Sequence, residues 1–142
     1  MRTPDVNVLL YAVNHDSPQH ETARTWIEAS FARREGIGFA WVALIGFLRL
    51  STRSGIFTRP LPIEAALGVV DGWLHHPCAH VLGATERHAG VLSRLLLSAG
   101  TGGHLVSDVH LAAIAIEHNA ELGTFDRDFN RFAGLRCALL KQ

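Results

Sequence analysis

The stretch "LGTFDRDF" at residues 122–129 places two carboxylates directly after a short apolar run. The run "ELGTF" at 121–125 is typical of a buried strand, and Asp126 stands where that strand should end. Asp128 follows two residues later. Acidic residues at such points are common in turns and caps. A functional role depends on whether other acidic residues stand at comparable points of the chain.

Around this stretch, short apolar runs alternate with helical patterns. Strands are predicted at residues 2–5, 37–40, 78–82, 121–125 and 135–140. Helices are predicted over residues 18–34, 41–52, 62–74 and 85–98, within 104–119, and as a single turn in "VNVLLYAV" after the first strand. This alternation predicts an α/β fold in which helices cover both faces of a short-stranded parallel sheet, a three-layer α/β/α arrangement.

Several local features refine this prediction. Ser17 and Pro18 are suited to the N-cap and first position of the helix at 18–34, and Gly36 should end that helix. The helix at 41–52 is apolar almost all round, which predicts burial on every side. We expect "GTGG" at 100–103 to form a hinge rather than a phosphate-binding loop, because no Lys-Ser or Lys-Thr pair follows it.

Length and composition indicate one globular domain over residues 1–142, with 48% apolar and 18% charged residues. No apolar run approaches the roughly 20 residues of a membrane span. Asp5 and Asn7 interrupt the region where a signal peptide would be apolar. Cys78 and Cys137 show no metal-binding or redox spacing. We therefore expect a reduced cytoplasmic protein without a membrane segment.

The net charge of zero argues against a conventional basic nucleic-acid-binding protein. All basic residues except Lys141 are arginines, which suit forked phosphate contacts, although a GC-rich genome also explains arginine enrichment. If Asp5, Asp108, Asp126 and Asp128 shared one site, the remaining acids would be outnumbered by basic residues. An acidic pocket on a mildly basic body is compatible with a metal-dependent enzyme that acts on a phosphate polymer.

Two further acids stand at points comparable to Asp126. Asp5 lies where the first strand should end, and ligands of open parallel sheets bind at the carboxyl ends of strands. Asp5 and Asp126 should therefore lie at the same edge of the sheet. Asp108 lies near the start of a helix that continues with the apolar residues "LAAIAI" at 111–116. Three separate elements would then bring carboxylates together.

Each acid also has a structural explanation. Asp5 is suited to cap a helix, and Asp108 near a helix N-terminus gains roughly 0.3–1 kcal/mol from the helix dipole. Asp126 and Asp128 are typical turn residues. Together, however, clustered carboxylates repel each other, and a bound divalent cation relieves that repulsion. A site with only oxygen ligands favours Mg²⁺ or Mn²⁺ over Zn²⁺.

Three segments resemble the PIN-domain ribonucleases, and most closely the VapC-type toxins of bacterial type II toxin–antitoxin modules. They are "PDVNVLLY" at 4–11, "GFLRLST" at 46–52 and "SDVHLAAIAIEHNAELGTFDRDFNRFAGL" at 107–135. The segments occur in the family's order, and the resemblance covers essentially the whole chain. The C-terminal segment is the most specific of the three.

The resemblance implies a PIN-like fold and a Mg²⁺-dependent ribonuclease in which Mn²⁺ can substitute. Asp5 and Asp108 match the principal metal-binding acids. Asp126 matches the third catalytic acid, which would orient the attacking water or hold a second metal ion. Asp128 matches a supporting acid.

The resemblance also assigns residues and partners around these acids. Asn7 resembles the polar residue that steadies the first Asp, and Arg49 the basic residue beside the family's second acid. Both are candidates for substrate binding, and a salt bridge is an equally good explanation of Arg49. The expected partners are an RNA substrate, a cognate antitoxin and a second copy of the chain in a homodimer. His104 and His110, close to Asp108, are further candidates for contact with substrate or partner.

One departure from the family leaves an alternative open. Family members usually carry a Glu before the "FLR" segment, where this chain has Gly46. The alternative is a catalytically degenerate PIN-like module that binds RNA or protein. A second alternative function is that of a phosphatase of the haloacid dehalogenase type, whose chemistry requires the motif D-x-D-x-T after the first strand. The segment "DVNVL" at 5–9 lacks the second Asp of that motif.

Overall fold

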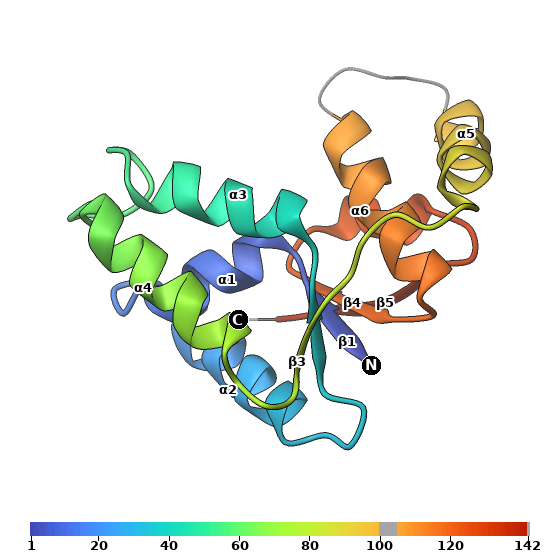
Figure 1. Ribbon diagram of the computed structural model, residues 1–142. Helices are drawn as coiled ribbons and strands as arrows, with labels where there is room; N and C mark the ends of the chain where they lie inside the picture. Colours follow the sequence, from blue (N-terminus) through green and yellow to red (C-terminus); the bar gives the residue numbers. More distant parts are fainter. Residues whose placement is uncertain (100–104, 142) are drawn as a thin grey trace.

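A computed structural model describes residues 1–99 and 105–141 (Figure 1). Five strands form one parallel sheet in the order β3-β2-β1-β4-β5. They are β1 (Arg2–Pro4), β2 (Ile37–Phe39), β3 (Ala79–Val81), β4 (Glu121–Thr124) and β5 (Arg136–Leu139). The helices are α1 (Val6–Val13), α2 (His20–Phe31), α3 (Trp41–Ser51), α4 (Ile63–Leu74), α5 (His88–Ala99) and α6 (Leu105–Glu117), with a 3₁₀ turn η1 (Arg127–Arg131).

The helices cover both faces of the sheet. Figure 1 shows α1 to α4 on one side and α5 and α6 on the other. One buried apolar cluster contains α1 to α4 residues such as Leu9, Leu44 and Phe47. A second cluster contains Val109 and Phe129 and lies on the α5–α6 side. The predicted three-layer α/β/α fold is therefore confirmed.

The centre of the sheet aligns the segments that carry the acidic residues. β1 pairs in parallel with β4, with Pro4 opposite Gly123, so both strands end at the same edge. Gly123 lies against the ring of Trp26 on α2, and a Cβ atom there would approach this ring to 2.4 Å. Glycine at this position therefore lets α2 pack directly on the sheet, next to the strand ends that follow.

Helix ends and exposure differ from the sequence-based expectation in several places. α2 begins at His20, because Ser17 and Pro18 form a preceding turn in which the Ser17 hydroxyl accepts the Gln19 amide at 3.1 Å. α2 also ends at Phe31, ahead of the predicted boundary at residue 34. "VNVLLYAV" forms an eight-residue helix rather than a single turn. The short turn η1 was not predicted.

The prediction that 41–52 is buried on every side is wrong. α1, α4 and α6 pack against α3, yet Trp41 and Ile45 on this helix remain exposed. The predicted hinge at 100–103 and the candidate His104 lie outside the described residues.

A buried polar network holds α5 against α6. The Glu117 side chain is fully buried and accepts the Thr85 amide at 2.8 Å, the Thr85 hydroxyl at 2.7 Å and His88 Nδ1 at 2.5 Å. Burial opposes ionisation of Glu117, but hydrogen bonds from Thr85 and His88 outweigh it and lower the pKa of this carboxyl. His88 Nε2 lies 2.9 Å from Nδ1 of His110 on α6. His110 thus contacts α5 and supports the helix that carries Asp108.

Candidate active site

Asp5 stands between β1 and α1, at the centre of the sheet edge. It is the N-cap of α1, and its Oδ1 accepts the Val6 amide at 2.7 Å. Its Oδ2 accepts the hydroxyl of Thr124, the last residue of β4, at 2.7 Å. The residue is only 5% exposed. The structural explanation of Asp5 as a helix cap is therefore correct, yet one capping bond does not account for the burial of the whole carboxylate.

The environment of Asp5 disfavours its charge. Burial raises the pKa of the Asp5 carboxyl from its ordinary value of 3.8 to about 6, and the negative charges of Asp108 and Asp126 add to this increase. Hydrogen bonds from Thr124 and Val6 act in the opposite direction but do not outweigh burial. A buried carboxylate repelled by other carboxylates gains stability when a cation binds beside it.

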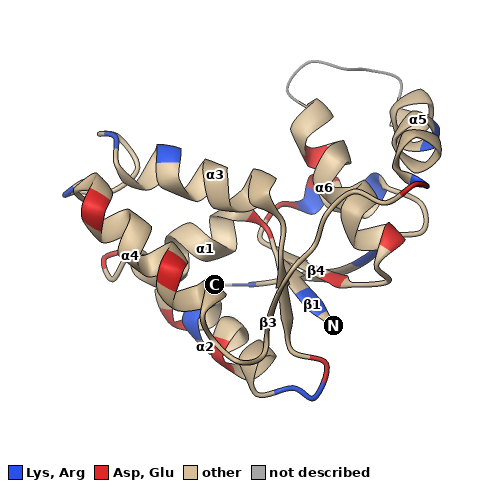
Figure 2. Ribbon diagram, in the orientation of Figure 1, with Lys and Arg blue, Asp and Glu red and all other residues tan. Residues whose placement is uncertain are grey.

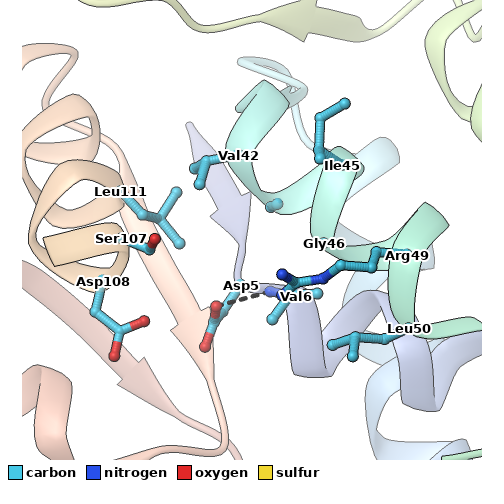
Figure 3. A pocket seen from close by; sticks show the side chains of 11 residues that line it. Asp5, Val6, Val42, Ile45, Gly46, Arg49, Leu50, Ser107, Asp108 and Leu111 are labelled. Atoms are coloured by element: carbon cyan, nitrogen blue, oxygen red, sulfur yellow. Dashed lines mark hydrogen bonds between the residues drawn. The ribbon is translucent and has the colours of Figure 1, made fainter. Parts of the chain in front are cut away.

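Asp5 and Asp108 line the same pocket, which has a volume of about 500 Å³. Asp108 comes from the first turn of α6, and Figure 3 shows its carboxylate and that of Asp5 pointing into the space between α6 and α1. Ser107 lies beside Asp108 at the same wall. The opposite wall is formed largely by apolar residues of α3, and the apolar lining of the pocket includes Val42, Ile45, Leu50 and Leu111.

α3 contributes Gly46 and Arg49 to this pocket. Arg49 is exposed, and in Figure 3 its side chain extends from α3 in the direction of Asp5. Gly46 faces Val6 of α1, and a Cβ atom at Gly46 would lie 2.9 Å from Val6 Cγ2. Glycine here therefore permits the close packing of α1 and α3. It also leaves the α3 wall without a carboxylate, since the pocket's acids are Asp5 and Asp108.

Asp126 and Asp128 lie near the pocket but do not line it. Asp126 caps η1, and its Oδ1 accepts the amide of Asp128 at 2.9 Å. Its own amide donates to Thr124 Oγ1 at 3.0 Å. Asp126 is nevertheless close enough to Asp5 for its charge to raise the pKa of that carboxyl. Three acids from three elements therefore gather at one sheet edge, while Asp128 lies further out on η1.

Asn7 supports the site from α1 without lining the pocket. Its Oδ1 accepts the Phe125 amide at 3.3 Å, and its Nδ2 donates to Thr124 Oγ1 at 3.4 Å. Asn7 thus ties α1 to the end of β4 and reaches Asp5 through Thr124. Its predicted contact with substrate would require the substrate to extend beyond the pocket.

Thr124 is the residue that sequence reasoning missed. Its hydroxyl donates to Asp5, accepts the amide of Asp126 and accepts from Asn7, so one buried oxygen joins three predicted site residues. The signal available in the sequence was its position at the end of the strand, two residues before Asp126. Threonine is also a common strand residue, so this position alone gives no reason to expect a role in the site.

The carboxylates at this site suit a hard cation that keeps most of its water ligands. Within residues 1–99 and 105–141, no three His, Cys, Asp or Glu side chains form a ready metal cluster. Among the described residues that line the pocket, the carboxylates are those of Asp5 and Asp108. Mg²⁺ commonly binds through one or two carboxylates and keeps several water ligands, so two acids facing one pocket fit it better than they fit Zn²⁺.

Solved structures of low sequence identity share this fold. The structure of VapBC2 from Rickettsia felis bound to a promoter DNA fragment aligns with a TM-score of 0.73 at 19% identity, covering 99% of this chain and 98% of that one. A toxin–antitoxin complex from Klebsiella pneumoniae aligns with a TM-score of 0.61 at 14% identity, covering 95% of both chains.

Sequence comparison is more specific. Ribonuclease VapC37 of Mycobacterium tuberculosis is 48% identical over 136 residues, which cover 96% of this chain and 94% of that protein. Ribonuclease VapC33 of the same species is 42% identical over 136 residues, covering 96% and 95%. The PIN domain family model matches residues 3–135. These matches argue against the phosphatase alternative. The chain belongs to the PIN-domain family, and within it to the group of the VapC ribonucleases.

Proposed function

We propose that this protein is a metal-dependent ribonuclease that acts as the toxin of a toxin–antitoxin pair. The observation that carries the proposal is the pocket in which Asp5 and Asp108, from different elements, present carboxylates to one space. The relatives named ribonucleases VapC37 and VapC33 align over 96% of the chain and support the same reaction. The reaction is hydrolysis of an RNA phosphodiester bond.

The proposed mechanism assigns each task to a residue near the pocket. Asp5 and Asp108 would hold Mg²⁺, or Mn²⁺ in its place, and the cation would supply positive charge to activate water and to neutralise charge on the scissile phosphate. Thr124 fixes the orientation of the Asp5 carboxylate through its 2.7 Å hydrogen bond. Asp126, beside this pair, is suited to orient the attacking water. Arg49 is suited to bind the phosphate, because its guanidinium is a forked donor.

The proposed partner at the pocket is a cognate antitoxin. A segment with apolar side chains and a basic residue would match the apolar α3 wall and the two carboxylates. We also propose a homodimer, supported by the exposed Trp41 and Ile45 of α3 and Leu67 of α4. Trp41 and Leu67 share a groove of about 460 Å³ between these helices, which a second copy would cover.

We propose that the protein acts in the cytoplasm. No described helix has the length and apolar character that a membrane crossing requires. Cys78 and Cys137 are both free thiols, as expected in a reducing compartment.

The alternative is a binding module without catalytic activity, and Gly46 is the observation that favours it. The α3 wall offers no carboxylate to a metal ion, so a site that needs an acid from α3 would be incomplete. The two proposals differ in a single measurable property, which is metal-dependent cleavage of RNA by the purified chain.

The test is cleavage of diverse RNAs by the purified, antitoxin-free protein with Mg²⁺, Mn²⁺ or EDTA, beside Asp108→Asn and Asp16→Asn. Asp16 is exposed and lies outside the pocket, so its variant is the matched control. We expect cleavage that needs metal, is retained in Asp16→Asn and falls at least a hundredfold in Asp108→Asn, since removing one electrostatic stabiliser costs about 10²–10³ in rate. A folded wild type that binds metal and cleaves none of the RNAs would support the binding module instead.

A further inference from the structure

We propose that Arg49 supplies the second positive charge at the scissile phosphate, so that the site works with one divalent cation. The inference rests on the proposed nuclease function and assigns this task to a side chain that lines the same pocket as Asp5 and Asp108. It follows from the unequal chemistry of the two walls of the pocket.

The two walls differ in their capacity to hold a cation. The junction of β1 and α1 supplies the carboxylate of Asp5 and α6 supplies that of Asp108, and these two acids are suited to one metal ion. The α3 wall supplies apolar side chains and Arg49. Hard divalent cations need oxygen ligands. A second metal ion on the α3 side would find no carboxylate there and would face a guanidinium.

The packing of α1 against α3 maintains this asymmetry. Gly46 is the α3 residue that faces Val6, and even a Cβ atom would lie 2.9 Å from Val6 Cγ2. Val6 thus occupies the space through which a longer side chain at position 46 would leave the helix. The sequence therefore places no metal-binding side chain at this position of α3, and Val6 occupies the space that such a side chain would need.

Arg49 is available for a phosphate. Within residues 1–99 and 105–141, no hydrogen bond or ion pair engages its guanidinium, and the side chain is exposed. Arg24, by comparison, is engaged by Glu21 and Glu28 at 2.8 and 2.7 Å. A guanidinium remains protonated throughout the working pH range and matches the geometry of a phosphate with two parallel hydrogen bonds.

The reaction balances with Arg49 unchanged. The water oxygen forms a bond to phosphorus, and the bond from phosphorus to the departing ribose oxygen breaks. The water loses one proton to a carboxylate or to solvent, and the departing oxygen gains one proton from solvent. Arg49 keeps its own protons and donates hydrogen bonds to non-bridging phosphate oxygens, where negative charge must be stabilised as the bond to water forms.

The first experiment counts metal ions without relying on activity. Mn²⁺ is titrated into the wild type and Arg49→Gln by calorimetry and followed by electron paramagnetic resonance, with and without adenosine monophosphate as an uncleavable phosphate ligand. We expect one Mn²⁺ per chain in both proteins under both conditions, with equal or tighter binding in the variant because a nearby positive charge is removed. Two Mn²⁺ per wild-type chain would overturn the proposal.

The second experiment measures RNA cleavage by Arg49→Gln and Arg49→Lys, with Arg53→Gln as the control. Arg53 is an exposed arginine four residues further along that does not line the pocket. We expect Arg49→Gln to lower kcat about a hundredfold with a smaller change in KM, because the interaction strengthens in the transition state. Arg49→Lys should recover part of this loss, and Arg53→Gln should match the wild type.

The outcomes separate this inference from the proposed function. If the wild type cleaves RNA and Arg49→Gln cleaves it equally fast, only the role of Arg49 is wrong. If Arg49→Gln raises KM and leaves kcat unchanged, Arg49 merely binds RNA and the inference also fails. If the wild type itself cleaves no RNA, the nuclease proposal fails, while the Mn²⁺ count still reports how many cations the pocket holds.

Discussion

At the scale of the residue, Asp5 has two tasks that are usually separate. One carboxylate oxygen caps α1 at Val6, and the other is held by the hydroxyl of Thr124. Both bonds favour the ionised carboxylate, yet burial and the charges of Asp108 and Asp126 still raise its pKa to about 6. The residue is therefore held in a defined orientation in an environment that disfavours its charge, which is the condition expected of a cation ligand.

The raised pKa of Asp5 predicts that the stability of the metal-free protein depends on pH. The pKa of Asp5 is higher in the folded state than in the unfolded state. Its protonation therefore contributes to the free energy of unfolding, and this contribution is fully present below about pH 4. It is lost as the pH rises through 6, by roughly 2–3 kcal/mol in total. Asp5→Asn cannot titrate. Urea unfolding in EDTA should therefore show that the wild type loses stability relative to Asp5→Asn between pH 4 and 7. Parallel stability profiles would contradict the raised pKa.

At the scale of the element, the contact between α1 and α3 decides what the pocket can contain. α1 begins directly after Asp5, and α3 lies across it with Gly46 above Val6. The small size of Gly46 brings the two helices together and leaves Arg49 as the charged side chain of the α3 wall. Helix packing at this one position thus fixes the chemistry of half the pocket.

Glycine-to-alanine substitutions test this contact against a matched control. Gly68 lies within α4 with open space around its Cα atom, so Gly68→Ala should stabilise the protein by about 1 kcal/mol through helix propensity. Gly46→Ala gains the same propensity but meets Val6, and overpacking costs about 1–3 kcal/mol. Urea unfolding should show no stabilisation, or a net loss, for Gly46→Ala. Equal stabilisation of both variants would show that Val6 moves aside freely.

At the scale of the whole molecule, the pocket joins the two helical layers. Asp5 leads into α1 on one face of the sheet, and Asp108 belongs to α6 on the other (Figure 1). The network of Glu117, His88 and His110 ties α6 to α5 behind the site. In Figure 2, the basic residues of the described chain are spread over helices, strands and loops. The acidic pocket, rather than a basic surface, is therefore the feature that suggests RNA chemistry.

A cation bound by both acids should stabilise the entire fold. Mn²⁺ at about one hundred times its Kd adds about 2.7 kcal/mol to the free energy of unfolding, which corresponds to a Tm increase of roughly 5–10 °C. Scanning calorimetry of the wild type, Asp108→Asn and Asp16→Asn measures this shift. We expect it in the wild type and Asp16→Asn but not in Asp108→Asn. An unchanged shift in Asp108→Asn would place the cation elsewhere.

The fold and part of the candidate site could be predicted from the sequence. The alternation of strands and helices predicted the three-layer fold, because burial of a parallel sheet on both faces produces a periodicity that is visible locally. The positions of Asp5 and Asp126 after strands placed them at one edge, since parallel strands end together. Helix ends were less predictable: Ser17 and Pro18 satisfy capping rules, yet the chain turns first and begins α2 at His20.

Only the tertiary structure decided which residues share the pocket and what surrounds them. Asp108 joins Asp5, whereas Asp126 caps η1 beside them, because its position depends on how the chain leaves β4. Thr124 joins the site through contacts with residues up to 119 positions away. The exposure of one face of α3 and the contact of Gly46 with Val6 likewise depend on neighbouring helices. Local sequence records which chemical groups are present, but contacts between distant segments determine which of them meet.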